Sequence, residues 1–181
     1  MGTPNAKLPE CLINGQPANQ IAITDRGLNY GDGLFETVRV SQGRIALLDY
    51  HLARLERGLQ ALKMKADLLQ VAQEWQDLAA LMGEGVIKLT LTRGVGQRGY
   101  AIPADAQPVR IQQCLPPVVY PLEHARDGVR LFPCTTQLAR QPLLAGIKHL
   151  NRLEQVLARS EWTDTQFAEG LVCDTLGLPI E

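Results

Sequence analysis

The spacing of apolar residues changes several times along the 181-residue chain, which predicts a mixture of strands and helices rather than a regular alternation. The stretch CLINGQPAN, residues 11–19, has an Asn-Gly turn after an apolar run, so we expect a hairpin there. Residues 21–48 form a second stretch rich in strand-forming residues. We expect another strand pair from it.

Two helices are predicted next, because leucines and other apolar residues recur at helical spacing. Asp49 is placed to cap the first helix. The second helix is expected over about residues 67–82. The buried stripe of the first is Leu52, Leu55, Leu59 and Leu62, and that of the second is Leu68, Val71, Trp75, Leu78 and Met82.

The stretch GVIKLTLTR, residues 85–93, alternates apolar with polar side chains, the pattern of a strand with one buried face. Its apolar face would be Ile87, Leu89 and Leu91, and its polar face Lys88, Thr90 and Thr92. VRIQQCL, residues 109–115, is predicted to be its neighbour. Together these elements predict a mixed α/β (α+β) fold.

A proline-rich stretch marks the predicted domain boundary, since Pro116, Pro117 and Pro121 remove backbone donors and fix an extended path. We therefore expect an N-terminal domain over 1–115, a linker over 116–121 and a second domain over 122–181. In the second domain we expect a strand at GVRLFPC, a helix marked by Leu150, Leu153, Val156 and Leu157, and a final hairpin turning at Gly177. Because the sequence stops within that last strand, we expect the second domain to be incomplete.

Composition and charge narrow the class of partner. The chain is 45% hydrophobic, has a net charge of -1 and a pI of about 6.3, which favours a packed core and gives no electrostatic footprint for nucleic acid or anionic membranes. A small-molecule partner is expected. No apolar run approaches the roughly 20 residues of a membrane span, and the N-terminus lacks a signal-peptide pattern, so we expect a cytoplasmic protein. The four scattered cysteines form no zinc or disulfide pattern and are expected to be reduced.

Residues 94–99, GVGQRG, fit the G-x-G-x-x-G pattern of dinucleotide-binding loops. Such a loop must open a helix, and here Pro103 and Pro108 fall where that helix would run, so we reject this interpretation. The loop still presents Arg98 and Tyr100, a donor set suited to a carboxylate. From the residues alone, a surface loop with incidental polar side chains is the simpler interpretation.

Lysine chemistry has more support in the sequence than serine or metal chemistry. The three histidines occur in no H-E-x-x-H motif, and no G-x-S-x-G is present. Lys148 lies between the loop residue Gly146 and the predicted helix of the second domain. A lysine can form an imine with an aldehyde cofactor and then act as a base, provided its site lowers its pKa. Most lysines near helix ends are solvated, so the residues alone leave both readings open.

Four stretches, in order, resemble the fold-type IV pyridoxal-phosphate enzymes of the class IV aminotransferase family. They are DRGLNYGDGLFETVRV (25–40), HLARL (51–55), RGVGQRGY (93–100) and LAGIKHLNRLEQVLAR (144–159). The resemblance runs from about residue 11 to the last residue, and within the family it is strongest to the 4-amino-4-deoxychorismate lyases. It implies a two-domain fold with pyridoxal 5'-phosphate as cofactor.

The resemblance also implies roles for individual residues. Lys148 matches the lysine that holds the cofactor as an imine and later transfers the proton, Arg54 the phosphate-binding arginine, and Glu181 the acid that pairs with the pyridine nitrogen. Arg98 and Tyr100 fall where relatives contact the substrate carboxylate, on a loop usually contributed across a homodimer interface. Phe35 falls at a position that lines the substrate pocket in relatives, whereas His149, beside Lys148, is expected to pack.

The implied reaction converts 4-amino-4-deoxychorismate to 4-aminobenzoate and pyruvate, which serves folate synthesis. Two alternatives remain: a D-amino-acid or branched-chain aminotransferase with the same lysine and cofactor, and a catalytically inactive domain that binds a small acid. Relatives in the family are longer, and their remaining phosphate-binding loops follow the position of Glu181. No metal is expected in the site.

Overall fold

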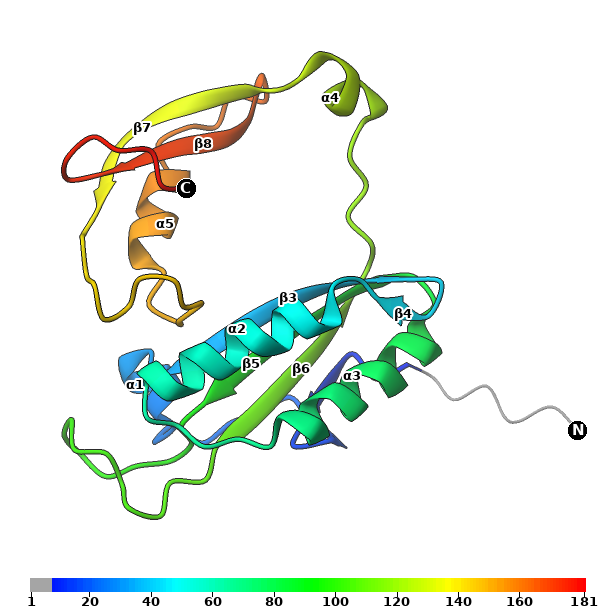
Figure 1. Ribbon diagram of the computed structural model, residues 1–181, viewed down its shortest axis with the longest axis vertical. Coiled ribbons are helices and arrows are strands. Elements are labelled where there is room, and N and C mark those ends of the chain that lie inside the picture. The colour runs from blue at the N-terminus through cyan, green and yellow to red at the C-terminus, as the bar shows by residue number, and fades with distance from the viewer. Residues whose placement is uncertain (1–7) are drawn as a thin grey trace, which may run out of the picture. The chain divides into compact units, whose positions relative to one another are not determined.

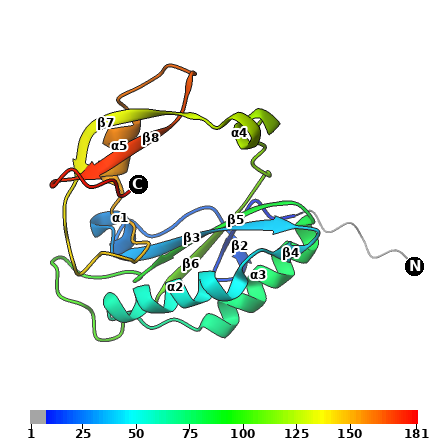
Figure 2. The same cartoon turned by 45° about the horizontal axis from the view of Figure 1, so that its top comes forward.

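The computed structural model describes residues 8–181, which divide into two compact units (Figures 1 and 2). The first unit runs to Val118 and includes Gly146–Leu150, and the second consists of Val119–Ala145 and Asn151–Glu181. The chain leaves the first unit within the expected linker 116–121. However, Gly146–Leu150 packs with the first unit, whereas the sequence placed it in the domain 122–181. Residues 1–7, which open the predicted domain 1–115, lie outside the described residues.

An antiparallel sheet in the order β2-β1-β6-β5-β3-β4 forms the centre of the first unit. The hairpin predicted at 11–19 and the strand pair predicted within 21–48 are confirmed: Asn14 and Gly15 at one turn, and Gln42 and Gly43 at the other, all have positive φ, as tight hairpin turns require. The pairing of the strands at 85–92 and 109–115 is confirmed too. The strands are β1 (Cys11–Ile13), β2 (Gln16–Pro17), β3 (Gly33–Ser41), β4 (Arg44–Ile45), β5 (Gly85–Thr92) and β6 (Val109–Leu115).

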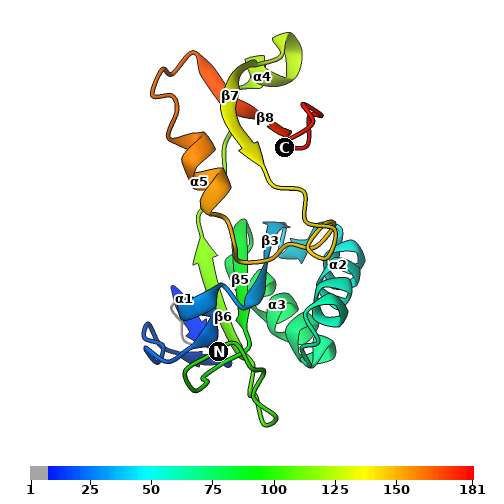
Figure 3. The same ribbon diagram turned by 90° about the vertical axis from the view of Figure 1, so that its left-hand side faces the viewer.

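Helices α2 (Leu48–Ala61) and α3 (Leu68–Met82) cover one face of this sheet, as Figure 3 shows. Their apolar stripes meet the inward side chains of β3 and β5 in one core cluster. Trp75 of α3 is completely buried in that cluster. The core therefore fixes α2 against β3, which carries much of the chemistry described below.

Local details differ from the sequence expectations at three places. Asp49 does not cap α2, because Leu47 takes the cap position in a left-handed conformation and Asp49 falls in the first turn. A short helix that was not predicted, α1 (Arg26–Tyr30), precedes β3. Thr92, expected on a polar face, is buried, and its hydroxyl is satisfied there by donating to Asp25 at 2.8 Å.

The second unit contains a parallel pair of strands, β7 (Arg130–Leu138) and β8 (Phe167–Asp174), with α4 (Leu122–Asp127) before them and α5 (Leu153–Arg159) between them in sequence (Figure 2). The predicted strand at 128–134 is confirmed. The predicted helix begins only at Leu153, so Leu150 lies outside it. After β8 the chain turns at Gly177 and pairs back, with Ile180 N donating to Val172 O at 3.0 Å, which confirms the final hairpin.

Candidate functional site

Lys148 lies in an extended segment that adds to the start of β3. Phe35 N donates to Lys148 O at 2.8 Å, and Leu150 N donates to Gly33 O at 3.0 Å. His149 pairs with Leu34 between these two bonds. The backbone of β3 therefore holds Lys148, and neither Lys148 nor His149 lies on a helix, since α5 begins only at Leu153.

The side chain of Lys148 contacts an aromatic ring on β3, the strand with which its backbone pairs. Its Nζ lies 4.3 Å from the centroid of Phe35, the separation of a cation–π contact. Phe35 is half-buried. Two residues that the sequence singled out are thus brought together by a short strand pairing between segments far apart in the chain.

The next residue along β3, Glu36, anchors a third predicted residue. Its completely buried carboxylate accepts hydrogen bonds from Arg54 Nε at 2.7 Å and Nη2 at 2.6 Å, and it also lies 2.7 Å from His51 Nδ1. A buried carboxylate is tolerated only when it is paired in this way. Glu36 was not predicted as a site residue. However, an acid between Leu34 and Val38 on the buried face of a strand indicates a buried ion pair.

Arg54, on α2, points part of its guanidinium away from Glu36. The hydrogen bond to Glu36 raises the pKa of Arg54, outweighing the effect of burial, so the side chain stays cationic. The Arg54 side chain is 38% exposed, and its Nη1 makes no hydrogen bond to any residue within 8–181. Two of its nitrogens are thus fixed by the protein while the remaining edge can meet an oxyanion.

Side chains on a strand alternate between faces, so Phe35 and Glu36 point to opposite sides of β3. Lys148 and Arg54 are therefore attached to successive residues of one strand but on its two faces. The short strand β4 and the residue after it pair with Arg39, Val40 and Ser41, so no strand within residues 8–181 covers the short stretch of this β3 edge between Phe35 and Arg39. A ligand at that edge has a lysine and an arginine anchored on either side of the same strand.

The loop between β5 and β6 carries Arg98 and Tyr100, and α1 supports it. Both side chains are exposed, Tyr100 by 86%. The Tyr100 ring packs edge-on against Tyr30 with 5.5 Å between centroids, and Tyr30 Oη accepts a hydrogen bond from Gly99 N at 3.2 Å. Arg98 and Tyr100 are thus held on a loop that is distinct from the strand pairing between Lys148 and Phe35.

Glu181 belongs to the second unit. Its backbone pairs with Val172, and its carboxylate accepts a hydrogen bond from Gln155 Nε2 of α5 at 2.9 Å. The acid is thus held at the end of the returning hairpin, with an exposed side chain.

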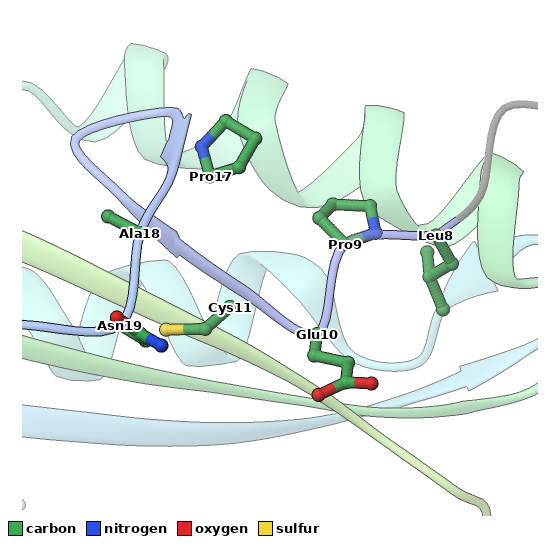
Figure 4. A pocket seen from close by; sticks show the side chains of 7 residues that line it. All are labelled: Leu8, Pro9, Glu10, Cys11, Pro17, Ala18 and Asn19. Atoms are coloured by element: carbon green, nitrogen blue, oxygen red, sulfur yellow. The ribbon is translucent and has the colours of Figure 1, made fainter.

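A separate hollow lies beside the first hairpin, in the first unit (Figure 4). It has a volume of about 550 Å³ and is an open depression at the β2–β1 end of the strand order. Among its lining residues within 8–181, none is a predicted site residue, and Glu10 and Cys11 carry the reactive side chains. Its lining residues are Leu8, Pro9, Glu10, Cys11, Pro17, Ala18 and Asn19.

Residues 8–181 also show what the described part of the chain lacks. In that range, no group of three or more histidine, cysteine, aspartate or glutamate side chains is placed to hold a metal ion. The four cysteines form no disulfide. None of the helices described has both the length and the apolar character needed to cross a membrane.

Comparisons with known proteins match nearly the whole chain. A family model described as amino-transferase class IV matches residues 33–181. An aminodeoxychorismate lyase of Vibrio harveyi is 36% identical over 171 residues, which are 93% of this chain and 63% of that relative. The crystal structure of 4-amino-4-deoxychorismate lyase from Pseudomonas aeruginosa superposes with a TM-score of 0.91 at 53% identity, covering 94% of this chain and 63% of that one.

A more distant structure shows the same fold with a cofactor named. It is an aminotransferase from Mycobacterium tuberculosis, described as hypothetical and as a PLP-bound form, with a TM-score of 0.68 and 22% identity. It covers 94% of this chain, and this chain covers 65% of it. The chain thus spans somewhat less than two thirds of the length of each of these relatives.

Proposed function

Because the chain belongs to the class IV aminotransferase family and has the fold-type IV fold of its pyridoxal-phosphate enzymes, we propose that the protein is an aminodeoxychorismate lyase. It converts 4-amino-4-deoxychorismate to 4-aminobenzoate and pyruvate, which serves folate synthesis. The observation that carries the proposal is the attachment of Lys148 and Arg54 to successive residues of β3. The likeness to the lyases from V. harveyi and P. aeruginosa favours this reaction over amino transfer.

The residues present suit pyridoxal 5'-phosphate. Glu36 orients the Arg54 guanidinium through Nε and Nη2 and leaves Nη1 out of this ion pair on a side chain that is 38% exposed, a geometry and charge that match a dianionic phosphate. Lys148 supplies the primary amine that an aldehyde requires. We assign the contact with the pyridine nitrogen to Glu181. When bound, the cofactor supplies an electron sink for a carbanion formed on the substrate.

The protein side chains then divide the remaining tasks. Once released from the cofactor, the free amine of Lys148 would remove the proton from the substrate carbon that carries the amine, and the departing enolpyruvate takes up a proton to become pyruvate. Departure of the enolpyruvyl group makes the ring aromatic, so a modest catalytic apparatus is sufficient. Arg98 and Tyr100 hold a substrate carboxylate and reduce the entropic cost of reaching a reactive geometry. Phe35 lines the substrate position and bounds the movement of the Lys148 side chain.

The same proposal includes the setting in which the enzyme works. We expect a cytoplasmic homodimer in which the Arg98–Tyr100 loop of one protomer reaches the site of its partner. The exposed apolar residues near that loop, including Val95 and Ile102, are consistent with such an interface. The only other partner expected is the small-molecule substrate.

Reductive trapping tests the proposal. The purified protein is incubated with pyridoxal phosphate, reduced with borohydride and mapped by mass spectrometry. A pyridoxyl adduct is expected on Lys148 and absent in Lys148→Met, while Lys65→Met, which removes an exposed lysine of the same unit, retains it. No adduct in the native protein would instead favour the inactive small-acid-binding domain.

Product analysis then separates the two reactions of the family. Release of pyruvate from aminodeoxychorismate without an amino acceptor is the expected result. An obligatory keto-acid acceptor would identify an aminotransferase of the D-amino-acid or branched-chain type.

A further inference from the structure

A buried arginine holds the backbone of the loop that carries Arg98 and Tyr100. Arg26 Nη1 donates to Gly99 O at 3.1 Å and Ala101 O at 3.2 Å, and its Nη2 donates to Tyr100 O at 3.3 Å. One guanidinium therefore satisfies three successive carbonyl groups. This contact fixes the path of the loop at the point from which the Arg98 and Tyr100 side chains project.

A second buried arginine holds the end of α2. Arg93 Nη2 donates to Leu62 O at 2.7 Å and its Nη1 to Lys63 O at 3.2 Å. These carbonyl groups follow the last helical residue, Ala61. Arg93 thus secures the helix that carries Arg54.

Asp32 joins the two arginines. Its Oδ2 accepts from Arg26 Nε and from Arg93 Nε, both at 2.8 Å. Both arginine side chains are 5% exposed, and that of Asp32 is 13% exposed. Burial alone would raise the pKa of Asp32, but the hydrogen bonds and charges of Arg93 and Arg26 outweigh it and lower the pKa. The carboxylate is therefore anionic at neutral pH, and the two guanidinium groups are fixed around it.

We propose that Asp32 is a positioning residue for substrate binding: through Arg26 it holds the Arg98–Tyr100 loop in its binding shape, and through Arg93 it ties that loop to α2. The inference rests on the proposed function, which gives Arg98 and Tyr100 their substrate contact. A loop fixed before the substrate arrives loses less conformational entropy on binding. Asp32 therefore acts on substrate affinity without touching the substrate.

Gly96 gives an independent way to disturb the same contact. A Cβ at this position would lie 2.8 Å from Arg26 Cδ and 3.0 Å from its Cγ. Gly96→Ala therefore displaces the Arg26 side chain without removing any charge. Asp105→Asn serves as the matched control for Asp32→Asn, since Asp105 is exposed in the same connection between β5 and β6.

The first measurement is amide hydrogen exchange of the cofactor-loaded native protein and the three variants. In Asp32→Asn and Gly96→Ala, we expect residues 96–101 to exchange about tenfold faster or more, as the loss of charge-assisted hydrogen bonds predicts. The core strands β3 and β5 keep their protection, and Asp105→Asn matches the native protein. Unchanged exchange of residues 96–101 in both variants overturns the proposal.

Steady-state kinetics provides the second readout. The KM for aminodeoxychorismate is expected to rise about tenfold in both variants, with kcat within about twofold of native and the absorbance of the Lys148-bound cofactor retained. A fall in kcat at unchanged KM overturns the positioning role. If Asp32→Asn fails to fold, Gly96→Ala decides by the same criteria.

A failure of the proposed function has a different signature. In that case the native protein itself releases no pyruvate, whatever the loop exchange shows. Failure of the positioning role requires an active native protein whose variants keep native loop exchange or native KM.

Discussion

Replacing the buried Glu36 tests whether the protein orients Arg54 before any cofactor binds. Glu36→Gln keeps the shape of the side chain but removes its negative charge. In the native protein this carboxylate accepts hydrogen bonds from Nε and Nη2 of Arg54 and lies beside His51. Arg54→Met makes the reciprocal change, leaving the carboxylate in place without its main partner. The two variants remove the same ion pair from opposite ends.

The structure predicts that the two variants lose unequal amounts of folding free energy. Removing one partner of a buried ion pair costs about 3–5 kcal/mol when the remaining charge cannot be solvated. This applies to Arg54→Met, which leaves the fully buried Glu36 with His51 alone. In Glu36→Gln the remaining charge is on Arg54, whose side chain is 38% exposed and can regain water, so we expect about 2–3 kcal/mol.

Urea unfolding of the cofactor-free protein measures both costs. Trp75 reports on the first unit, and a Trp162→Phe background removes the fluorescence of the second. With an m value of about 2 kcal/mol/M, the expected losses lower the midpoint by about 1 M or more. Glu56→Gln and Arg57→Met, at exposed positions of the same helix, are the matched controls and should change stability by less than about 0.5 kcal/mol.

Two results would refute this reasoning. If both variants match their controls, Glu36 does not hold Arg54 in solution. If Glu36→Gln costs more than Arg54→Met, the stability of the carboxylate depends on groups other than Arg54, and the solvent exposure of the two partners does not decide the order.

Two further predictions concern stability alone. In the second unit, hydrogen bonds from Thr136 and Thr135 lower the pKa of Glu161 from 4.5 to about 2. Because the folded pKa is depressed, its stabilising contribution is present above about pH 4.5 and is lost as the pH falls toward 2. The stability difference between native protein and Glu161→Gln, followed by thermal unfolding, should therefore be constant from pH 5 to 8 and shrink below pH 4.5; a difference that grows on acidification contradicts it. In the first unit, Asp67 accepts two backbone N–H groups at the start of α3, so Asp67→Ala should cost about 1 kcal/mol in urea unfolding and Asp67→Asn much less; equal losses would exclude the cap.

Regular elements were predictable wherever the signal is local. The helix expected at 67–82 is observed at Leu68–Met82, because its apolar period and its Asp67 cap lie within one stretch of chain. The start of α2 was not predicted correctly, since the connection from β4 places Leu47 in a left-handed conformation that no neighbouring residue indicates. Thr92 was assigned to the wrong environment for a similar reason: its buried partner, Asp25, is distant in sequence.

The candidate site was predictable only in part. Composition and spacing left Lys148 between a reagent and a solvated charge, and family resemblance alone singled out Arg54 and Glu181. The pairing of residues 148–150 with the start of β3 joins segments more than a hundred residues apart, which no periodicity could show. Glu36 was within reach of the sequence, as an acid on an apolar face. The cluster around Asp32 could not be predicted from the sequence, because its two arginines come from a short helix and from the residue that follows β5.

The two acids near the start of β3, Asp32 and Glu36, orient their arginines for the same physical reason. Asp32 immediately precedes the strand and Glu36 lies within it, and each is paired with cationic partners that the other does not share. Both carboxylates are largely shielded from water, Glu36 completely and Asp32 with 13% of its side chain exposed, so each keeps its arginine partners in one orientation before a ligand arrives. The two acids differ in the groups that their arginines contact beyond the ion pair. Arg26 directs its remaining nitrogens to backbone carbonyls and so acts through a loop, whereas Arg54 keeps an exposed edge and so acts through its charge. Two acids, one just before β3 and one within it, thereby separate the shaping of the substrate loop from the binding of an anionic cofactor group.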